Sequence, residues 1–314
     1  MQKRVQPAVD AALTPRSGFS RLGQPLSYSR APSPDLAPWV GWLYATAVEA
    51  PADHHVDCGL LNDMASLRIQ LSGQWTAQTA TGPMDLGPAA LHFGPQSRRM
   101  AIGVTGSFVS IGVSLRPGAA TSATGRNTRD FIDRVTRLEN LDFPDGLALL
   151  DLNPQADPEV WLGALEAFVR SVIERSDARA PEDITSRFEL LAYADPNASV
   201  EEFARECGIG VRQFERIILR DFGLSPKQVL RRARALDMAA HFRGVADEAE
   251  SEELLLRYYD QSHLIREFTH LFGMTPRQFI ARPQPIMTLA LETRQARRLQ
   301  AIQRLQPGGA RPWA

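Results

Sequence analysis

The sequence lacks the features that mark membrane, secreted and disulfide-stabilised proteins. No apolar run approaches the roughly 20 residues that a membrane-spanning helix needs, and the polar first 21 residues lack the apolar core of a secretory signal. The two cysteines, Cys58 and Cys207, cannot form a disulfide framework or a four-thiolate zinc site by themselves. We therefore expect a cytoplasmic protein without membrane association, in which both cysteines are plain buried thiols.

The chain also lacks an excess of charge of either sign, because its formal net charge is −1 over 314 residues. Bulk charge therefore gives no support for nucleic-acid binding, and any such claim depends on local charge. Residues 205–235 carry eight basic and three acidic side chains, which makes a local positive patch. Apolar residues are plentiful at 44%, enough for the cores of two ordinary domains.

The N-terminal half alternates apolar and polar residues with a period of two. Such alternation runs through residues 67–71 and 109–115, and Gly and Pro turn signals separate the runs. Short strands at that spacing predict a small β-barrel or sandwich, which we place at residues 36–155. Residues 1–35 are rich in Pro, Ser and Arg and are expected to form a flexible arm.

An amphipathic helix is predicted over residues 156–178. Trp161, Leu165 and Phe168 recur at helical spacing on one face. We expect this face to pack on its own domain, and a seam with a partner subunit is the alternative. Residues 179–183 are expected to be a linker to a purely helical region.

One phrase occurs twice, fifty residues apart: FGLSPKQV at 222–229 and FGMTPRQF at 272–279. In each copy the glycine can end one helix in a left-handed conformation, and the hydroxyl residue and proline can cap and start the next. Two short helices joined by a Gly-Ile-Gly turn precede the first copy, and a helix capped by Asp260 precedes the second. The sequence therefore predicts two helix-turn-helix units bridged by a long helix over residues 226–242.

This arrangement resembles the AraC/XylS type of transcription regulators, whose DNA-binding part is a pair of helix-turn-helix units joined by a linker helix. The residues that carry the resemblance are FARECGIGVRQFERIILRDFGLSPKQVLRRAR at 203–234 and YYDQSHLIREFTHLFGMTPRQF at 258–279, and it covers residues 184–282. More loosely, GPQSRR at 94–99 and IGVSLRPGAA at 111–120 are similar to the sensory and dimerisation domain of a subset of these regulators.

The resemblance implies an α+β fold class. We expect an N-terminal cupin-like β-barrel or sandwich plus a helix, followed by an all-α domain with two helix-turn-helix units joined by a linker helix. It also implies a regulator that binds promoter DNA, more often an activator than a repressor, acting as a homodimer with RNA polymerase. A small-molecule effector in the N-terminal domain is an open alternative to a domain that only dimerises.

Helical geometry and the resemblance together nominate the residues that contact DNA. Helices of about ten to twelve residues fit the major groove, and we expect recognition helices at about 211–221 and 261–271. The outward-facing candidates are Arg212, Glu215, Arg216 and Arg220 in the first unit and Gln261, Ser262, His263 and Arg266 in the second. Arg212 and Arg266 are the candidates for base reading, since a guanidinium group matches the two acceptors of guanine.

Three arginines of the bridging helix, Arg231, Arg232 and Arg234, are expected at phosphates, where they would position the protein without reading sequence. The second unit departs from the expected pattern, because Arg257 stands in its turn and residues 247–253 are acidic. His263 borders the apolar face, so a core role is its alternative. We expect the first unit to dominate DNA affinity.

A metal-dependent enzyme is the main rival prediction. The candidate metal ligands in the N-terminal half are His54, His55, Asp57, Cys58 and His92. Adjacent histidines on a strand point to opposite faces, so His54 and His55 cannot both enter one site. We therefore expect no catalysis, cofactor or metal. An effector pocket ringed by Trp39, Trp42, Trp75 or Phe93 competes with plain core packing of these aromatic residues. The basic tail, residues 283–314, has apolar positions between 286 and 305 that favour an extra helix.

Overall fold

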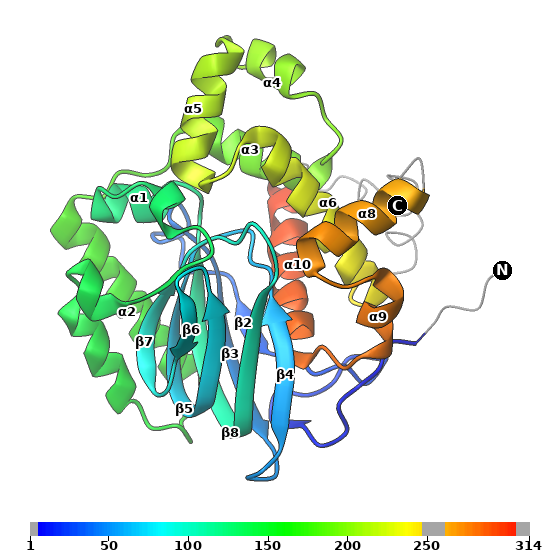
Figure 1. Cartoon of the computed structure of the whole chain (residues 1–314). Coiled ribbons are helices and arrows are strands. Elements are labelled where there is room, and N and C mark those ends of the chain that lie inside the picture. Colours follow the sequence, from blue (N-terminus) through cyan, green and yellow to red (C-terminus); the bar gives the residue numbers. More distant parts are fainter. Residues whose placement is uncertain (1–5, 247–260, 306–314) are drawn as a thin grey trace.

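The structure, a computed structural model, describes residues 6–246 and 261–305. Its strands form one antiparallel sheet in the order β1-β3-β8-β5-β7-β9, with β2 paired to β3, β4 to β8 and β6 to β5 (Figure 1). The strands are β1 (Thr14–Pro15), β2 (Tyr28–Arg30), β3 (Val40–Glu49), β4 (His55–Leu60), β5 (Ser66–Thr79), β6 (Gly82–Asp85), β7 (Ala89–Phe93), β8 (Met100–Leu115) and β9 (Val135–Arg137).

Helices flank this sheet and make up the C-terminal part of the chain, which confirms the α+β class. After β8 come α1 (Ala119–Thr124), the 3-10 helices η1 (Thr128–Phe131), η2 (Leu138–Leu141) and η3 (Pro144–Asp151), and α2 (Pro158–Ser176). The all-helical part contains α3 (Asp183–Ala194), α4 (Val200–Glu206), α5 (Val211–Phe222), α6 (Pro226–Phe242), α8 (Gln261–Phe272), α9 (Pro276–Ala281) and α10 (Pro285–Leu305).

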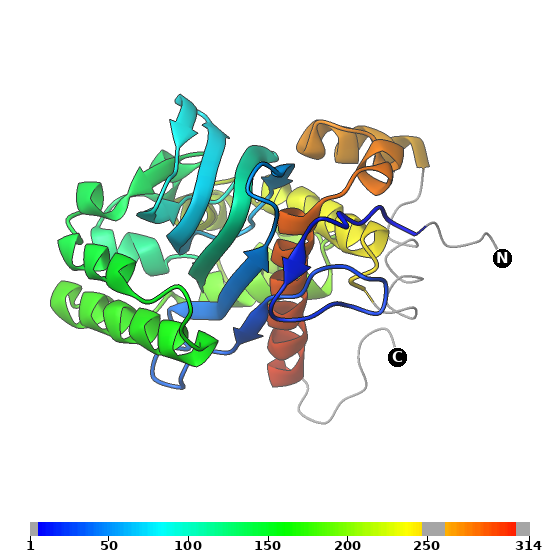
Figure 2. The same cartoon turned by 90° about the horizontal axis from the view of Figure 1, so that it is seen from below.

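The two faces of the sheet are covered by different helices, because side chains alternate along each strand. On β8, Ile111 and Val113 turn to one face and share a core with α2. Val104 and Phe108 turn to the other face, in a core that also contains residues of α6, α8 and α10. Figure 2 shows α2 and α10 on opposite sides of the strands. The prediction that the amphipathic helix packs on its own domain is confirmed.

A β-bulge in β5 changes which face its side chains cover. The pairing of β5 with β8 shifts register on both sides of Ser72. Next to it, Gly73 has a φ of 100°, and a Cβ atom there would lie 2.7 Å from the Cβ of Phe108, so only glycine fits. Ile69 therefore faces α2, whereas Trp75 faces the opposite core.

The repeated phrase forms the helix boundaries that the sequence predicts. Gly223 and Gly273 end α5 and α8 with φ values of 73° and 67°. Ser225 and Thr275 cap α6 and α9, each in a complete capping box with the glutamine three residues later. The bridging helix α6 spans residues 226–242, as predicted.

The predicted extra helix near the C-terminus exists, but it is an inner element and not a tail. α10 contacts β3, β4, α3 and α6 and lies along the sheet. Met287 and Leu291 are buried, and so are Arg294 and Arg298. Residues 306–314 lie outside the described part. None of the described helices has both the length and the apolar composition that a membrane crossing requires.

The expected flexible arm is also wrong for the part of it that the structure describes. β2 pairs with β3, and the backbone N–H of Ala8 donates to the Ile280 carbonyl at 2.9 Å. The guanidinium of Arg243, which is fully buried, donates to the Ala8 carbonyl at 2.7 Å. Composition could not predict these contacts, because they use backbone N–H and carbonyl groups, which nearly every residue has.

Candidate nucleic-acid interface

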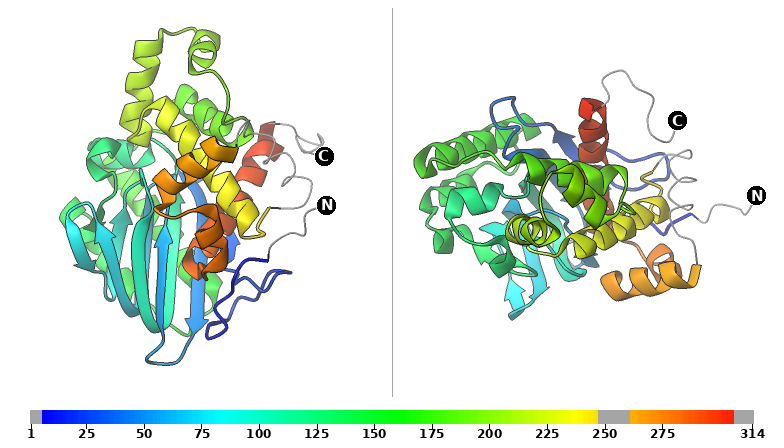
Figure 3. Two further views of the ribbon diagram at one scale, coloured as in Figure 1. Left: turned by 45° about the vertical axis from the view of Figure 1, so that its right-hand side comes forward. Right: turned by 90° about the horizontal axis from the view of Figure 1, so that it is seen from above.

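The first helix-turn-helix unit has a hydrophobic core of its own. α3, α4 and α5 pack around Phe188, Phe203 and Phe214, whose ring centroids lie 5.1 to 5.6 Å apart. Gly208, with a φ of 69°, makes the turn between α4 and α5. Ser199 caps α4 by accepting a hydrogen bond from the Glu202 backbone at 3.2 Å. Figure 3 shows α4 and α5 projecting beyond the sheet.

The outward face of α5 carries unpaired positive charge. Phe214 and Ile218 are fully buried, and Arg212, Glu215 and Arg216 on the other side of the helix are exposed. Within the described residues, neither the Arg212 nor the Arg216 guanidinium forms a hydrogen bond or an ion pair. A helix of twelve residues with two such groups has the size and the donors to enter a major groove.

Arg220, also predicted to contact DNA, is held by carboxylates at the end of α5. Its guanidinium pairs with Asp221 at 2.6 Å and with Glu182 at 2.8 Å. The hydrogen bond to Asp221 is the main reason that the pKa of Arg220 is raised. Asp221 itself is buried and accepts a hydrogen bond from Thr185 at 2.5 Å. Arg220 thus fastens α5 to α3, and its contact with DNA stays a prediction.

The prediction that Arg232 contacts phosphate is wrong for this arrangement. The Arg232 side chain points inward from α6 and is 1% exposed. It donates to the backbone carbonyls of Gln96 and Asp63, both at 2.7 Å, and burial lowers its pKa to about 10. Sequence periodicity failed here because a charged residue on a helix is normally placed on the solvent side, whereas this one satisfies two loop carbonyls.

The other two arginines of α6 share one carboxylate of the second unit. Glu267 on α8 is 4% exposed and pairs with Arg231 and Arg234, both at 3.2 Å. Arg234 also donates to the Pro196 carbonyl at 2.8 Å and is only partly exposed, whereas Arg231 retains an exposed side chain. Phosphate contact is therefore open to Arg231 more than to Arg234.

The second unit lies against the sheet. The carbonyl of Leu271 at the end of α8 accepts a hydrogen bond from the Arg99 backbone at 2.7 Å. Phe268 and Phe272 stack with centroids 4.2 Å apart, and both belong to the core that includes the sheet. Ser262 and Arg266 are exposed on α8. The residues predicted to form the first helix of this unit, together with Arg257 and Asp260, lie outside the described part of the chain, as do the side chains of Gln261 and His263.

A buried ion-pair network ties α10 to both halves of the molecule. Arg294 pairs with Asp63, in the loop before β5, at 3.0 Å and with Asp237 of α6 at 2.6 Å. Arg297 pairs with the same Asp63 at 2.7 Å. Burial alone would raise the pKa of Asp63, but Arg297, Arg294 and Arg232 hold it well below its usual range. The network therefore fixes α10 between sheet and linker helix.

The candidate ligands of the rival metal site do not converge on one point, although His55 and Asp57 are paired. His54 pairs with Asp10 at 3.0 Å, and His55 pairs with the exposed Asp57 at 3.3 Å. His92 is buried against Phe131, and burial lowers its pKa to about 4. Cys58 is buried under α10. Among the residues that the structure describes, no group of three or more such side chains could hold a metal ion.

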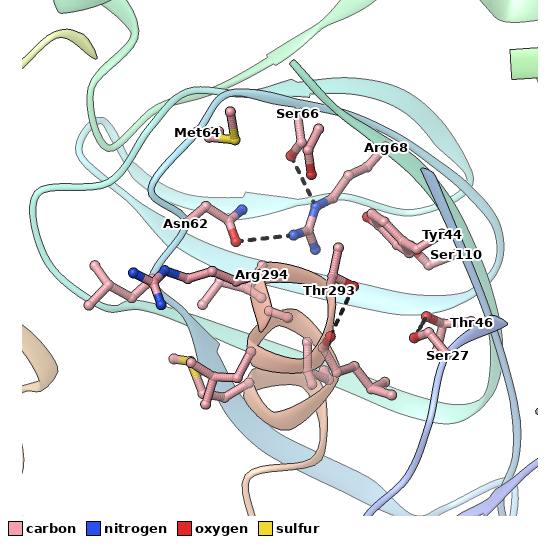
Figure 4. A pocket seen from close by; sticks show the side chains of 18 of the residues that line it. Ser27, Tyr44, Thr46, Asn62, Met64, Ser66, Arg68, Ser110, Thr293 and Arg294 are labelled. Atoms are coloured by element: carbon pink, nitrogen blue, oxygen red, sulfur yellow. Dashed lines mark hydrogen bonds between the residues drawn. The ribbon is translucent and has the colours of Figure 1, made fainter. Parts of the chain in front are cut away.

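The four aromatic residues proposed to ring an effector pocket do not surround one cavity. Trp75 lines a cavity between the sheet and α10, and Trp39 lines a separate apolar cavity beneath α2. Phe93 is core. The cavity under α10 contains a residue that sequence reasoning missed, the buried Arg68 (Figure 4). The sequence feature that could have indicated it is the row of polar residues Ser66, Arg68 and Gln70, which alternates with apolar residues along β5.

Two family models match the chain. Residues 203–282 match a helix-turn-helix domain of the AraC type, and residues 28–137 match a domain of unknown function, DUF6597. No curated protein matches the sequence significantly. The second match gives the sheet region a family without assigning it an activity.

Several solved structures are similar at low identity. Fatty-acid-bound ToxT from Vibrio cholerae strain SCE256 has 9% identity and a TM-score of 0.42, with 76% of this chain and 93% of that chain covered. ToxT from Vibrio cholerae O395 bound to (E)-4-(8-methylnaphthalen-1-yl)but-3-enoic acid has 9% identity and a TM-score of 0.43, covering 76% and 96%. The AraC-like transcriptional activator CuxR has 15% identity and a TM-score of 0.27, covering 63% and 78%. Likeness at this level decides neither fold nor function.

The family assignment therefore comes from the helical region, where the matched residues contain the repeated helix boundaries and the bridging helix. The C-terminal part of this chain is a helix-turn-helix domain of the AraC type, the DNA-binding domain of a family of transcription regulators.

Proposed function

We propose that the protein is a sequence-specific DNA-binding transcription regulator in which α5 reads the major groove. The observation that carries this proposal is the outward face of α5, where Arg212 and Arg216 are exposed and have no partner among the described residues. An exposed guanidinium without a carboxylate is free to pair with guanine or with phosphate. Glu215 between them would discriminate against a phosphate and accept from a base amino group.

Arg266 and Ser262 of α8 are proposed as the second contact set, with Gln261 and His263 beside them in sequence. Arg231 is proposed at a phosphate, and Arg220 would contact DNA only beside its carboxylate partners. α6 bridges the two units, and its core residues Leu230 and Leu236 belong to the cores of the first and second unit respectively. Because α6 packs into both cores, it supports a fixed spacing between the two recognition helices.

The proposal is tested by selection from a random duplex library with the purified full chain. We expect enrichment of a bipartite motif whose two halves lie about one helical turn apart. The Arg212→Ala, Arg216→Ala variant should lose the first half of the motif, and Arg175→Ala, on α2, should enrich the wild-type motif. Recovery of no enriched sequence by the wild type would reject the proposed function.

Activation, homodimer formation, contact with RNA polymerase and cytoplasmic location follow from the resemblance and stay predictions. Reporter transcription from the selected site measures the direction of regulation, and sedimentation velocity measures the oligomeric state. We also propose that the sheet domain binds an effector, supported by the cavity under α10.

A further inference from the structure

Ile265 is an apolar side chain exposed on a helix that is proposed to read DNA. It is 45% exposed within α8. Among the described residues between 183 and 305, the only other exposed large apolar side chain is Val211, at the first residue of α5. Val211 precedes the buried Phe214 and Ile218 by three and seven residues, so it lies on the inward side of α5, where that helix begins. Ile265 is therefore the exposed apolar residue that the end of a helix does not explain.

The two candidate recognition helices correspond residue by residue. Buried residues of α5 are followed fifty positions later by buried residues of α8, namely Phe214 and Leu264, Ile218 and Phe268, and Phe222 and Phe272. In the same register, the exposed Arg216 of α5 corresponds to the exposed Arg266 of α8. The outward faces of the two helices can therefore be compared position by position.

The residue beside this shared arginine differs between the two helices. Glu215 is exposed on α5 at the position that Ile265 takes on α8, and each directly precedes the arginine. A glutamate carboxylate accepts hydrogen bonds, whereas an isoleucine side chain has no donor or acceptor and makes only apolar contacts. The two outward faces thus have one cation in common and opposite chemistry next to it.

The surroundings of Ile265 fit DNA better than a protein partner. Ser262 and Arg266, three residues before it and one after it, are both exposed. Surfaces that bind other proteins are contiguous apolar patches, and a single isoleucine between a hydroxyl group and a cation does not form one. The major groove presents a matching mixture, because guanine offers acceptors to an arginine and thymine offers an apolar C5-methyl group.

We propose that Ile265 reads a thymine by contact with its C5-methyl group, whereas Glu215 reads the corresponding base of the other half-site through an amino group, above all that of cytosine. These contacts require α5 and α8 in the major groove, so they rest on the proposed function. The operator would have two half-sites that share the contact of the arginine and differ at the neighbouring base. Such unlike halves would fix the direction in which the protein lies on the duplex.

The methyl contact is tested by removing thymine methyl groups one at a time from the duplex that the random library selects. Each thymine is replaced by deoxyuridine, which pairs like thymine but lacks the C5-methyl group, and affinity for the full chain is measured by fluorescence anisotropy. The half-site of α8 is the one that the Arg212→Ala, Arg216→Ala variant still selects. We expect one substitution in that half-site to weaken wild-type binding about fourfold, the effect of exposing one buried methyl-sized group.

Removing the side chain and the methyl group together assigns the contact to Ile265. Ile265→Ala should bind the thymine duplex about fourfold more weakly than the wild type and should show no further loss with deoxyuridine at the sensitive position. Val160→Ala, which truncates an exposed apolar side chain of α2, is the matched control. It should keep the wild-type affinity and the fourfold sensitivity to deoxyuridine.

Exchanging the two residues tests the comparison between the helices. Ile265→Glu should change the preferred base at the sensitive position from thymine to cytosine, and Glu215→Ile should change the corresponding base of the other half-site to thymine. Selection from the random duplex library measures both preferences. Because both side chains are exposed, these variants should melt close to the wild-type temperature.

Insensitivity of the wild type to every deoxyuridine substitution would rule out the methyl contact. Full sensitivity in Ile265→Ala, or unchanged base preferences in the exchange variants, would also rule it out. In these cases the wild type still selects a motif, so the proposed function would stand, whereas a wild type that selects no motif would remove both. If Ile265→Ala binds every duplex like the wild type but lowers reporter transcription, Ile265 serves a protein contact and the methyl contact is wrong.

Discussion

α5 and α8 are both twelve residues long and both end at a glycine in the left-handed region, yet they rest on different supports. α5 packs with α3 and α4 in a core that draws almost all its residues from the helical region. α8 packs in a core that it shares with the sheet and α10. The core of the first unit is built almost wholly from helices, although the end of α5 also contacts η1 and α1, whereas the second unit shares its core with the sheet.

The difference shows that equal local sequence signals do not give equal surroundings. The boundaries of both helices follow from local chemistry, since a glycine, a hydroxyl cap and a proline act within a few residues. What each helix exposes depends on its tertiary neighbours. Arg212 and Arg216 of α5 have no partner in the part of the chain that the structure describes, whereas Glu267 of α8 is buried beneath two arginines of α6.

The largest expected effect separates the two cores. Phe214→Ala and Phe268→Ala each remove a fully buried ring, so each should lower the free energy of unfolding by about 3–5 kcal/mol. Phe214→Ala should lower protection mainly in α3, α4 and α5, whereas Phe268→Ala should lower protection in α8, α10 and β4 together. Hydrogen exchange read by mass spectrometry measures both patterns. Loss of protection throughout the sheet in Phe214→Ala would show that the two units are not supported differently.

The ion-pair network under α10 is expected to matter nearly as much. Asp63→Asn leaves Arg294 and Arg297 with one carboxylate between them and should cost about 3 kcal/mol, as removal of one partner of a buried pair does. Chemical denaturation measures this value. Asp35→Asn, which breaks an exposed pair with Arg170, is the control and should change little.

The same substitution should change the acid limb of the stability curve. The pKa of Asp63 is lower in the folded than in the unfolded chain, so its contribution is complete above about pH 4 and is lost as the pH falls further. Asp63→Asn should therefore lose less stability than the wild type between pH 4 and pH 2. Parallel acid limbs in the two proteins would contradict the network.

Glu292 should have a smaller effect on stability, with a pH dependence of the opposite sign to that of Asp63. Burial raises its pKa to about 8, and its Oε2 atom has no partner within the described residues. Because the folded pKa exceeds the unfolded value of 4.5, its contribution to stability is present below about pH 4.5 and is lost as the pH rises through 8. Glu292→Gln should gain on the order of 1 kcal/mol at pH 8 and little at pH 5. Melting temperatures at the two pH values check this, and an equal change at both would contradict it.

The smallest expected effect is that of Glu267→Gln on the salt dependence of DNA binding. Glu267→Gln releases Arg231 and Arg234, so the slope of log affinity against log salt should steepen by up to about 1. Fluorescence anisotropy with the selected duplex measures the slope. Glu174→Gln on α2 is the control, and an unchanged slope in Glu267→Gln would mean that both arginines stay away from phosphate.

Sequence reasoning found what local rules determine and missed what distant contacts determine. The first unit, the bridging helix, the described helices α8 and α9 of the second unit and the outward face of α5 follow from caps and from the 3.6-residue period. The burial of Arg232 does not, because its partners are carbonyls about 136 and 169 residues away. α10 was found as a helix, but its position depends on Asp63 and Asp237, which no periodicity links to it.

The sequence predicted only part of the environment of the polar residues around Arg68. Alternation in β5 and β8 identified the apolar face, and such alternation is normal for a sheet with its other face in water. Only the placement of α10 shows that both faces are covered. A polar alternate row beside a spare amphipathic helix is therefore worth treating as a candidate cavity wall.

The most direct test is the affinity of α5 variants for the selected duplex, measured by anisotropy at several salt concentrations. We predict that Arg212→Ala, Arg216→Ala weakens binding about 100-fold or more, since each contact contributes about 1–3 kcal/mol, and that Arg266→Ala weakens it less. Equal affinities of the wild type and the double variant across the salt range would contradict the account.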